Sequence, residues 1–337
     1  MRSGWLLRSA PIIGIFIVLL LVTSLVVPNF LSISNIPNVL QQMSIVGIVA
    51  VGMTFVILTG GIDLSVGSIL EVSTVLYALA LAHQWPSPVA LLVALGSGLA
   101  FGIVNAVGIS VFNIQPFIMT LATLAVGGGV ALAITNGAQV IFTTSDPLIS
   151  LLGNGSFGPL PAEFVVLAVI VAIGIVVLRY TPFGRFIYAV GGSAEAARLS
   201  GIRVRWILFS VYAISGLCAG LAGAMTAARL STGVPTAGGT TNLDAIAAVV
   251  IGGTSLFGGI GGIPGTVVGS LVLAAVSNVL NLLGVSPYTS LIVKGAIIVG
   301  TVLVVSSDLR GWIRGGWQAA RKTSAAGAGS ARKAPSR

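Results

Sequence analysis

Long apolar runs fill most of this 337-residue chain and constrain its fold more than any other feature. A helix that crosses the roughly 30 Å hydrocarbon core of a bilayer needs about 20 apolar residues. Only 7% of the residues are charged, whereas a soluble domain carries roughly 25%. Because a soluble fold of this length needs far more polar surface, the sequence predicts an all-α, polytopic membrane protein.

The runs predict about ten transmembrane helices. The first run follows Arg2 and Arg8, as a signal peptide would, but it is long for one and no small-residue cleavage site follows it. We therefore interpret it as an uncleaved first helix. The predicted spans are residues 11–28, 39–59, 66–82, 88–108, 116–136, 162–178, 206–228, 243–261, 264–284 and 287–305.

The distribution of Lys and Arg predicts the orientation. These residues cluster before the first span, in the loop after the sixth span and after the tenth span, and only Arg229 and Lys294 lie elsewhere. Ten spans place all three clusters on one face, which the positive-inside rule assigns to the cytoplasm. An odd number would separate the terminal clusters. We therefore expect both termini inside, N-in and C-in.

The chain divides into two predicted parts. Residues 1–308 form the transmembrane domain, which includes a charged cytoplasmic loop at 179–205. Residues 309–337 are basic and rich in Ala, Gly and Ser, a composition that buries too little apolar surface to fold. This pattern predicts a disordered cytoplasmic tail near anionic lipid.

The inner loop reads RYTPFGRFIYAVGGSAEAARLSGIRVR and contains the signature of a short helix. Ser193 is a suitable N-cap, Glu195 falls in the first turn, and Gly201 is a suitable stop. A helix of about seven residues is marginal alone in water, so we expect it to dock on a partner. The alternative is a loop whose arginines only fix the orientation.

Two hairpins, one in each half of the chain, are interrupted by glycine. The early hairpin contains Gly60, Gly61, Asp63 and Ser65, and Asp63 or Ser65 can cap the following span. The late one, within 243–276, contains Gly258 and Gly259. Transporters build pathways from such broken helices, which suggests pathway or gate elements. The alternative is that glycine only permits close helix packing.

Polar side chains inside the spans are further candidates. A charge at mid-bilayer costs about 2.5–3.5 kcal/mol on insertion scales and needs a partner or water. Glu71 and Asp244 are possible partners of Lys294. Asn278 and Asn281 share one helix face, so they form either a hydroxyl-recognising stripe or packing hydrogen bonds. The candidate pathway or gate residues are Gly60, Gly61, Asp63, Ser65, Glu71, Asn105, Asp244, Gly258, Gly259, Asn278, Asn281 and Lys294.

A long outer connection at 137–161 is rich in Gly, Ser, Thr, Asn and Pro and contains one acid, Asp146. It is either a lid or re-entrant segment over the outer mouth or a packed loop.

Several kinds of chemistry are excluded. There is no phosphate-binding G-x-x-x-x-G-K-[ST] loop, so the chain cannot hold ATP in the usual way. The one histidine, His83, lies in an outer loop, and the one cysteine, Cys218, excludes an internal disulfide. An intramembrane aspartyl protease would need two facing acids, but Asp63 and Asp244 fall on opposite faces. Active transport would therefore use an ion gradient or a partner protein.

Six motifs carry a resemblance to a known family. They are GGIDLSVGS at 60–68, AVGGSAEAARLSGI at 189–202, LDAIAAVVIGGTSLFGG at 243–259, GT at 265–266, NLLGVS at 281–286 and IVKG at 292–295. In this order, over about 39–305, they resemble the membrane permease of ribose-type ABC sugar importers, within the branched-chain amino acid/ribose permease superfamily. The motifs are specific to the family but not to one sugar.

The resemblance implies a type II ABC importer permease that imports a monosaccharide or similar small polar solute by alternating access. It implies a second permease copy or close paralogue, an ABC ATP-binding subunit that binds ATP-Mg, and an extracytoplasmic sugar-binding protein. It implies no cofactor or catalytic residue in this chain, which would lie in a bacterial inner membrane. One departure is at 239–242, where many relatives carry an aromatic residue and an acid.

The resemblance also assigns the inner loop. The segment from Ala189 to Gly201 is similar to the coupling helix that enters a cleft on the ATPase. The implied coupling residues are Gly191, Gly192, Ser193, Glu195, Ala197, Arg198, Leu199 and Gly201.

Two other functions stay open from the residues alone. An ion-coupled secondary transporter would need intramembrane acids along a relay, for which Glu71 is the main candidate. A passive channel or scaffold would have no use for a capped inner loop.

Overall fold

The computed structural model describes residue 27 and residues 30–305. It divides into two compact units, residues 1–290 and 291–337. Helix α13 (Pro287–Val305) begins in the first unit and continues in the second. The predicted span at 11–28, apart from Val27, and the predicted tail at 309–337 lie outside the described residues.

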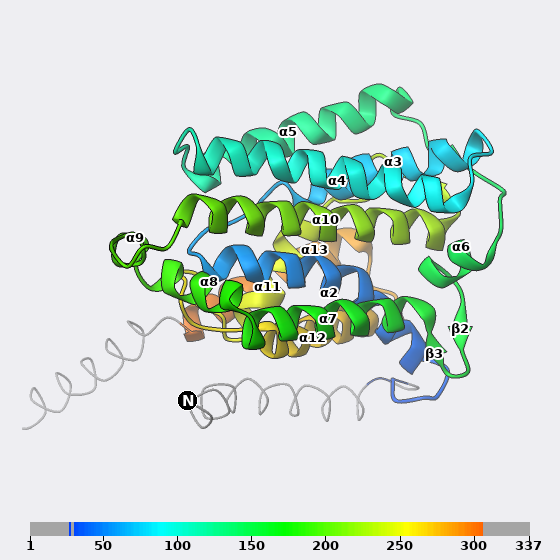
Figure 1. Cartoon of the computed structure of the whole chain (residues 1–337). Coiled ribbons are helices and arrows are strands. Elements are labelled where there is room, and N and C mark those ends of the chain that lie inside the picture. Colours follow the sequence, from blue (N-terminus) through cyan, green and yellow to red (C-terminus); the bar gives the residue numbers. More distant parts are fainter. Residues whose placement is uncertain (1–26, 28–29, 306–337) are drawn as a thin grey trace, which may run out of the picture. The chain divides into compact units, whose positions relative to one another are not determined.

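The first unit consists mainly of helices (Figure 1). Six described helices, α2, α4, α5, α7, α10 and α12, are long and apolar enough to cross a membrane, while α3 and α11 are shorter. This confirms a helical, polytopic membrane fold, whereas the count of ten remains a prediction. The helices are α2 (Ile36–Leu58), α3 (Val66–Ala82), α4 (Ser87–Ser110), α5 (Pro116–Thr135), α6 (Pro147–Leu152), α7 (Ala162–Tyr180), α8 (Pro182–Gly192), α9 (Ala194–Leu199), α10 (Val204–Leu230), α11 (Thr241–Ile251) and α12 (Ile263–Leu282).

Helices α2 and α10 form the centre of the first unit. Residues 47–58 of α2 are all buried, as expected for a helix that is apolar on every side. Helix α10 packs against α2, α3 and α4. Gly98 on α4 and Gly216 on α10 face each other so closely that a Cβ on either would collide with the other's carbonyl oxygen. Here glycine serves close helix packing, as small residues commonly do in membranes.

The late hairpin corrects one predicted span. The span expected at 243–261 is helical only as α11, which has 11 residues and a length of about 16 Å, too short to cross a bilayer. The chain then continues as a non-helical loop to α12. Four glycines of this loop, at 253, 258, 259 and 261, have positive φ, a conformation that side-chain-bearing residues rarely adopt. The helix therefore ends at Ile251, although the apolar run in the sequence continues beyond it.

The outer connection at 137–161 is a packed loop. It contains α6 and three two-residue strands: β2 (Ser156–Phe157) and β3 (Leu160–Pro161) form one antiparallel pair, and β1 (Val140–Ile141) pairs antiparallel with β4 (Thr232–Gly233), which follows α10. Three of its own side chains, Phe142, Ile149 and Leu152, are buried. The packed alternative is therefore favoured, and the short strands are a small addition to the predicted all-α fold.

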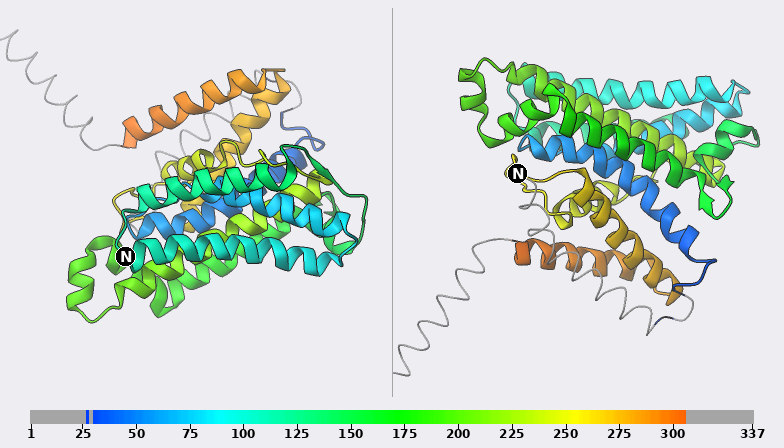
Figure 2. Two further views of the ribbon diagram at one scale, coloured as in Figure 1. Left: turned by 90° about the horizontal axis from the view of Figure 1, so that it is seen from above. Right: turned by 60° about the horizontal axis from the view of Figure 1, so that its bottom comes forward.

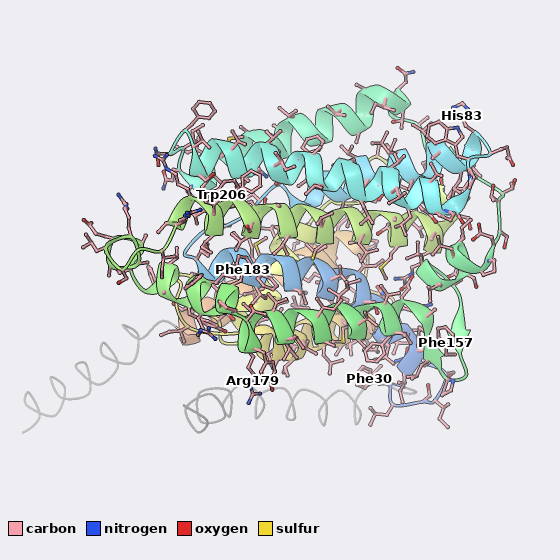
Figure 3. The ribbon with its side chains drawn as sticks, viewed as in Figure 1. Phe30, His83, Phe157, Arg179, Phe183 and Trp206 are labelled. Atoms are coloured by element: carbon pink, nitrogen blue, oxygen red, sulfur yellow. The ribbon has the colours of Figure 1, made fainter. Side chains whose placement is uncertain are left out.

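The first unit has two ends that are useful for locating residues (Figures 2 and 3). The α9 end contains α8, α9, the α2–α3 turn at residues 59–65 and the α4–α5 turn at residues 111–115. Trp206 lies toward it (Figure 3). The α6 end contains α6, the strands and the α3–α4 turn with His83 (Figure 3).

Candidate functional site

The inner loop forms the short helix that its sequence predicts. In α9 the Ser193 hydroxyl oxygen accepts a hydrogen bond from the Ala196 N–H at 3.2 Å. At the other end Gly201 has φ +83°, and the Ile202 N–H donates to the Ala197 carbonyl at 3.0 Å. The predicted N-cap and stop are therefore both correct, because they depend on chemistry within a few residues.

Helix α8, which precedes α9, was not expected. Thr181 caps it by accepting a hydrogen bond from the Gly184 N–H at 3.3 Å, and Pro182 occupies its first turn. A threonine followed by proline is a recognised helix start, so this dipeptide was the available signal.

The last turn of α8 meets two other glycine-containing segments, the α2–α3 turn and the loop between α11 and α12. The Gly259 N–H donates to the Leu58 carbonyl at 3.0 Å. A Cβ on Gly191 would collide with the Leu58 oxygen and lie 2.5 Å from the Gly259 nitrogen. A Cβ on Gly258 would lie 2.8 Å from the Gly60 nitrogen and 2.9 Å from the Gly191 oxygen. We call Leu58, Gly60, Gly191, Gly258 and Gly259 the glycine junction.

A tyrosine adds a second link between α8 and the late loop. The Tyr188 hydroxyl donates a hydrogen bond to the Gly261 carbonyl at 2.9 Å. Burial raises the pKa of Tyr188, so the hydroxyl keeps its proton at physiological pH. The structure thus brings together the early hairpin, the late hairpin and Gly191 of the predicted coupling segment.

Apolar side chains are exposed at the same end. Leu199 of α9 is 85% exposed, and Phe257, beside the glycine junction, is 94% exposed. Glu195 and Arg198 are also exposed on α9, whereas Ala197 packs into the core. Such a surface is typical of a site where another protein or a membrane binds.

A buried polar network surrounds the early hairpin. The Asp63 carboxylate accepts hydrogen bonds from the Ser65 N–H at 3.0 Å and hydroxyl at 2.5 Å, and from the Ser215 hydroxyl at 2.7 Å. The Asn105 amide donates to the Ser65 hydroxyl oxygen at 2.8 Å, and the Thr123 hydroxyl donates to the Asn105 carbonyl at 2.6 Å. The network therefore joins the start of α3 to α4, α5 and α10.

The network is closed to solvent in this structure. Asp63 is 0% exposed, and Ser65 and Asn105 are also buried. Ser65 is the N-cap residue of α3, but its side chain does not cap the helix. The predicted cap is therefore wrong for both residues, because Asp63 accepts the N–H of Ser65, which precedes α3, and α3 has no side-chain cap hydrogen bond. The partners Ser215 and Thr123 carried no sequence signal, because isolated hydroxyl residues are common in transmembrane helices.

Glu71 contacts backbone rather than a cation. Its carboxylate accepts hydrogen bonds from the N–H groups of Gly238 and Gly239, in the segment before α11. Asp244 is buried in the first turn of α11. Lys294 lies in the second unit, so its expected pairing with Glu71 or Asp244 stays a prediction.

The late asparagines do not form one stripe. Asn278 is buried and exchanges two hydrogen bonds with Asn35, at 2.7 and 3.0 Å. Asn281 is exposed. This geometry favours packing hydrogen bonds for Asn278, the second of the two alternatives.

Sequence reasoning missed one buried acid. Glu163, at the start of α7, is 0% exposed, and its Oε2 lies 3.9 Å from Nη1 of Arg229. Neither carboxylate oxygen has a hydrogen-bond partner in the described part of the chain. Arg229, one of the two cations outside the clusters, was the signal that could have led to it.

Comparison with known proteins identifies the family. The profile of the family described as branched-chain amino acid transport system / permease component matches residues 35–302. This chain belongs to that permease family. Ribose import permease protein RbsC of Escherichia coli (strain K12) is 44% identical over 304 residues, which cover 90% of this chain and 94% of the relative.

Other relatives agree. Ribose import permease protein RbsC of Bacillus subtilis (strain 168) is 42% identical over 302 residues, covering 90% of this chain and 94% of the relative. Galactofuranose transporter permease protein YtfT of Escherichia coli (strain K12) is 36% identical over 316 residues, covering 91% and 92%. No solved structure matches the chain.

Membership fixes the general role of the protein. Permeases of this family are the membrane subunits of ABC transporters, and ATP hydrolysis belongs to a separate subunit. The chain is therefore a multi-pass protein of the bacterial inner membrane and not itself an enzyme. It works with an ATP-binding subunit and a substrate-binding protein.

Proposed function

We propose that this chain is the permease subunit of an ATP-driven importer for a monosaccharide, with ribose as the first solute to test. The support comes from relatives that are named ribose import permeases and are 44% and 42% identical over nearly their whole length. An ion-coupled secondary transporter is not favoured, because Glu71, its main candidate acid, accepts hydrogen bonds from backbone N–H groups.

The charge distribution supports the proposed orientation, and the resemblance to ribose-type permeases supports the proposed partners. We expect ten crossings, N-in and C-in, of which the one at 243–261 is made by α11 together with the loop after it rather than by one helix. The arginine-rich loop at 179–205 then lies in the cytoplasm and the α9 end faces inward. A second copy of the chain, or a close paralogue, completes the membrane part. The ATP-binding subunit holds ATP-Mg, and the permease itself needs no cofactor.

Helix α9 is the proposed docking element for the ATP-binding subunit. It is short, capped by Ser193, and exposes Glu195, Arg198 and Leu199. Phe257 extends the exposed apolar surface at the same end. A partner that covers these side chains would remove apolar area from water, which favours association.

One observation carries the coupling mechanism, namely the contact of Gly191 with both hairpins at the glycine junction. Gly191 of α8 packs so closely on the Leu58 carbonyl and the Gly259 N–H, which are hydrogen-bonded to each other, that a Cβ does not fit there. Movement of α9 on ATP binding would therefore reach the early and late hairpins together. These hairpins, with the remaining candidate pathway and gate residues, are the proposed moving elements of alternating access.

Two neighbouring glycines provide the test. A Cβ on Gly191 collides with backbone, whereas a Cβ on Gly192 meets no atom within 4 Å. Backbone displacement of this kind costs about 1–3 kcal/mol, so we expect Gly191→Ala to lower ATP-dependent ribose uptake roughly tenfold. Gly192→Ala, the matched control, is expected to retain uptake. Membrane insertion of both variants is checked by their yield in the membrane fraction.

Equal uptake by the two variants would contradict the proposed coupling through the glycine junction. Loss of ribose uptake in both variants would also contradict it. The contact at Gly191 would then not explain the loss, because Gly192 lacks such a contact.

A further inference from the structure

A cavity of about 260 Å³ opens at the α9 end of the first unit. Four elements line it: the α2–α3 turn, the α4–α5 turn, the α8–α9 connection and α10. Its volume is slightly below the roughly 300 Å³ at which small-molecule sites begin, so it suits a small solute rather than a nucleotide.

Half of the residues that line the cavity are apolar, and its polar residues are all uncharged. Thr59, Asn113 and Gln115 contribute hydroxyl and amide groups. Among the described residues, none that lines the cavity is charged. Asn113 and Gln115 are exposed at the rim. The Thr59 hydroxyl donates to the Val56 carbonyl at 2.8 Å and keeps its lone pairs as acceptors. The lining therefore offers neutral donors and acceptors.

The floor of the cavity leads toward the buried polar network. Tyr212 and Gly61 line the cavity and are buried, and a Cβ on Gly61 would collide with the Tyr212 hydroxyl. That hydroxyl has no hydrogen-bond partner within the described residues. Gly61 is two residues from Asp63, the centre of the network. The cavity thus lies between the network and the α9 end.

We propose that this cavity is a release site for a neutral polyhydroxy solute, the monosaccharide of the proposed function, on its way to the cytoplasm. The inference rests on the proposed function and adds a place and a chemical class to it. A sugar satisfies neutral amides and hydroxyls with its own hydroxyl groups. A zwitterionic amino acid would leave two charges without opposite partners in this lining, which is costly.

The position of the cavity also ties release to the ATP-binding subunit. Val190 near the end of α8 and Ala194 at the start of α9 both line it, on either side of the cap residue Ser193. Displacement of α9 therefore changes the cavity wall directly. The cavity opens or narrows as the docking element moves.

Protection from labelling tests the site. The probe is Gln115→Cys in a permease that also carries Cys218→Ala, so that it has a single thiol. This variant is placed in nanodiscs with its ATP-binding subunit, and the rate of its reaction with a maleimide is measured. At a ribose concentration of about four times Kd the site is roughly 80% occupied, so labelling should slow about fivefold. Ser200→Cys, also exposed at the α9 end but outside the lining, is the matched control and should be unaffected.

Leucine at the same concentrations is the competing solute and should not protect Gln115→Cys. Asn113→Cys, in the same turn, is a second probe in case the first variant does not fold. Unchanged labelling of both probes with ribose, equal slowing at Ser200→Cys, or equal protection by leucine would each overturn the inference. Ribose uptake by the unmodified transporter is measured alongside. Uptake without protection defeats only the release site, whereas absence of uptake defeats the proposed function.

Discussion

Asp63 is the residue on which the early hairpin depends. Its carboxylate accepts hydrogen bonds from Ser65 and Ser215, and Asn105 and Thr123 extend the network to two further helices. Removing one partner of a buried polar group leaves the other without a hydrogen bond, and this costs more than the bond itself contributes. Asp63 therefore holds the start of α3 against α10.

Two serines of α10 test this role. Ser215→Ala leaves one oxygen of buried Asp63 without its donor, so we expect a loss of about 1–3 kcal/mol in stability. Ser210→Ala is the control, because Ser210 donates only to the Trp206 carbonyl of its own helix and should change little. The measurement is the thermal midpoint of the detergent-solubilised protein. Equal midpoints for the two variants would show that the network does not stabilise the fold.

At the residue scale, sequence reasoning succeeded where the chemistry is local. Ser193 and Gly201 were identified as cap and stop because both act on backbone groups within a few positions. Ser215, Thr123 and Glu163 were missed because their partners come from other helices. The Gly191 contact was missed for the same reason, since no local pattern places α8 against two distant turns.

At the element scale, hydropathy located helices better than it located their ends. The predicted span at 66–82 coincides with α3, where a polar turn precedes the apolar run. The span at 243–261 ends as a helix at Ile251. Its later residues stay apolar, and only the glycines mark the change, so a hydropathy reading extends the helix too far.

Helix α6 gives a pH-dependent prediction. Burial raises the pKa of Asp146, but hydrogen bonds from Ser87, Ile149 and Leu148 outweigh it and hold the pKa below its ordinary value of 3.8. A lowered pKa contributes stability that is complete above the ordinary value and is lost as pH falls through the folded pKa. We therefore expect α6 to stay protected from neutral pH down to about pH 4 and to loosen below it.

Variants of Asp146 separate the cap from its charge. Asp146→Ala removes the acceptor for the Ile149 N–H and should loosen α6 at every pH by about 0.5–2 kcal/mol. Asp146→Asn keeps an acceptor oxygen and should lose only the acid dependence. Hydrogen exchange of residues 147–152 reports both effects. Loosening of the unmodified loop between pH 5 and 8 would contradict the assignment.

At the scale of the whole molecule, composition and charge were sufficient for the class of protein. Low charge predicted a polytopic membrane fold, and ordered motifs predicted the permease family, to which the chain belongs. The predicted orientation and number of spans remain predictions. They depend on the bilayer and on three Lys and Arg clusters, two of which lie outside the described residues. The solute depends on partner proteins and on contacts that a single chain does not specify.

The central claim is that this permease moves a monosaccharide only when a separate subunit hydrolyses ATP. The most direct measurement is ribose accumulation in proteoliposomes that contain the permease with its ATP-binding subunit, ATP-Mg on the side of α9 and the substrate-binding protein opposite. We expect ATP-dependent accumulation that Glu195→Arg in α9 abolishes. Accumulation by this chain alone, driven by an ion gradient without ATP, would contradict the account.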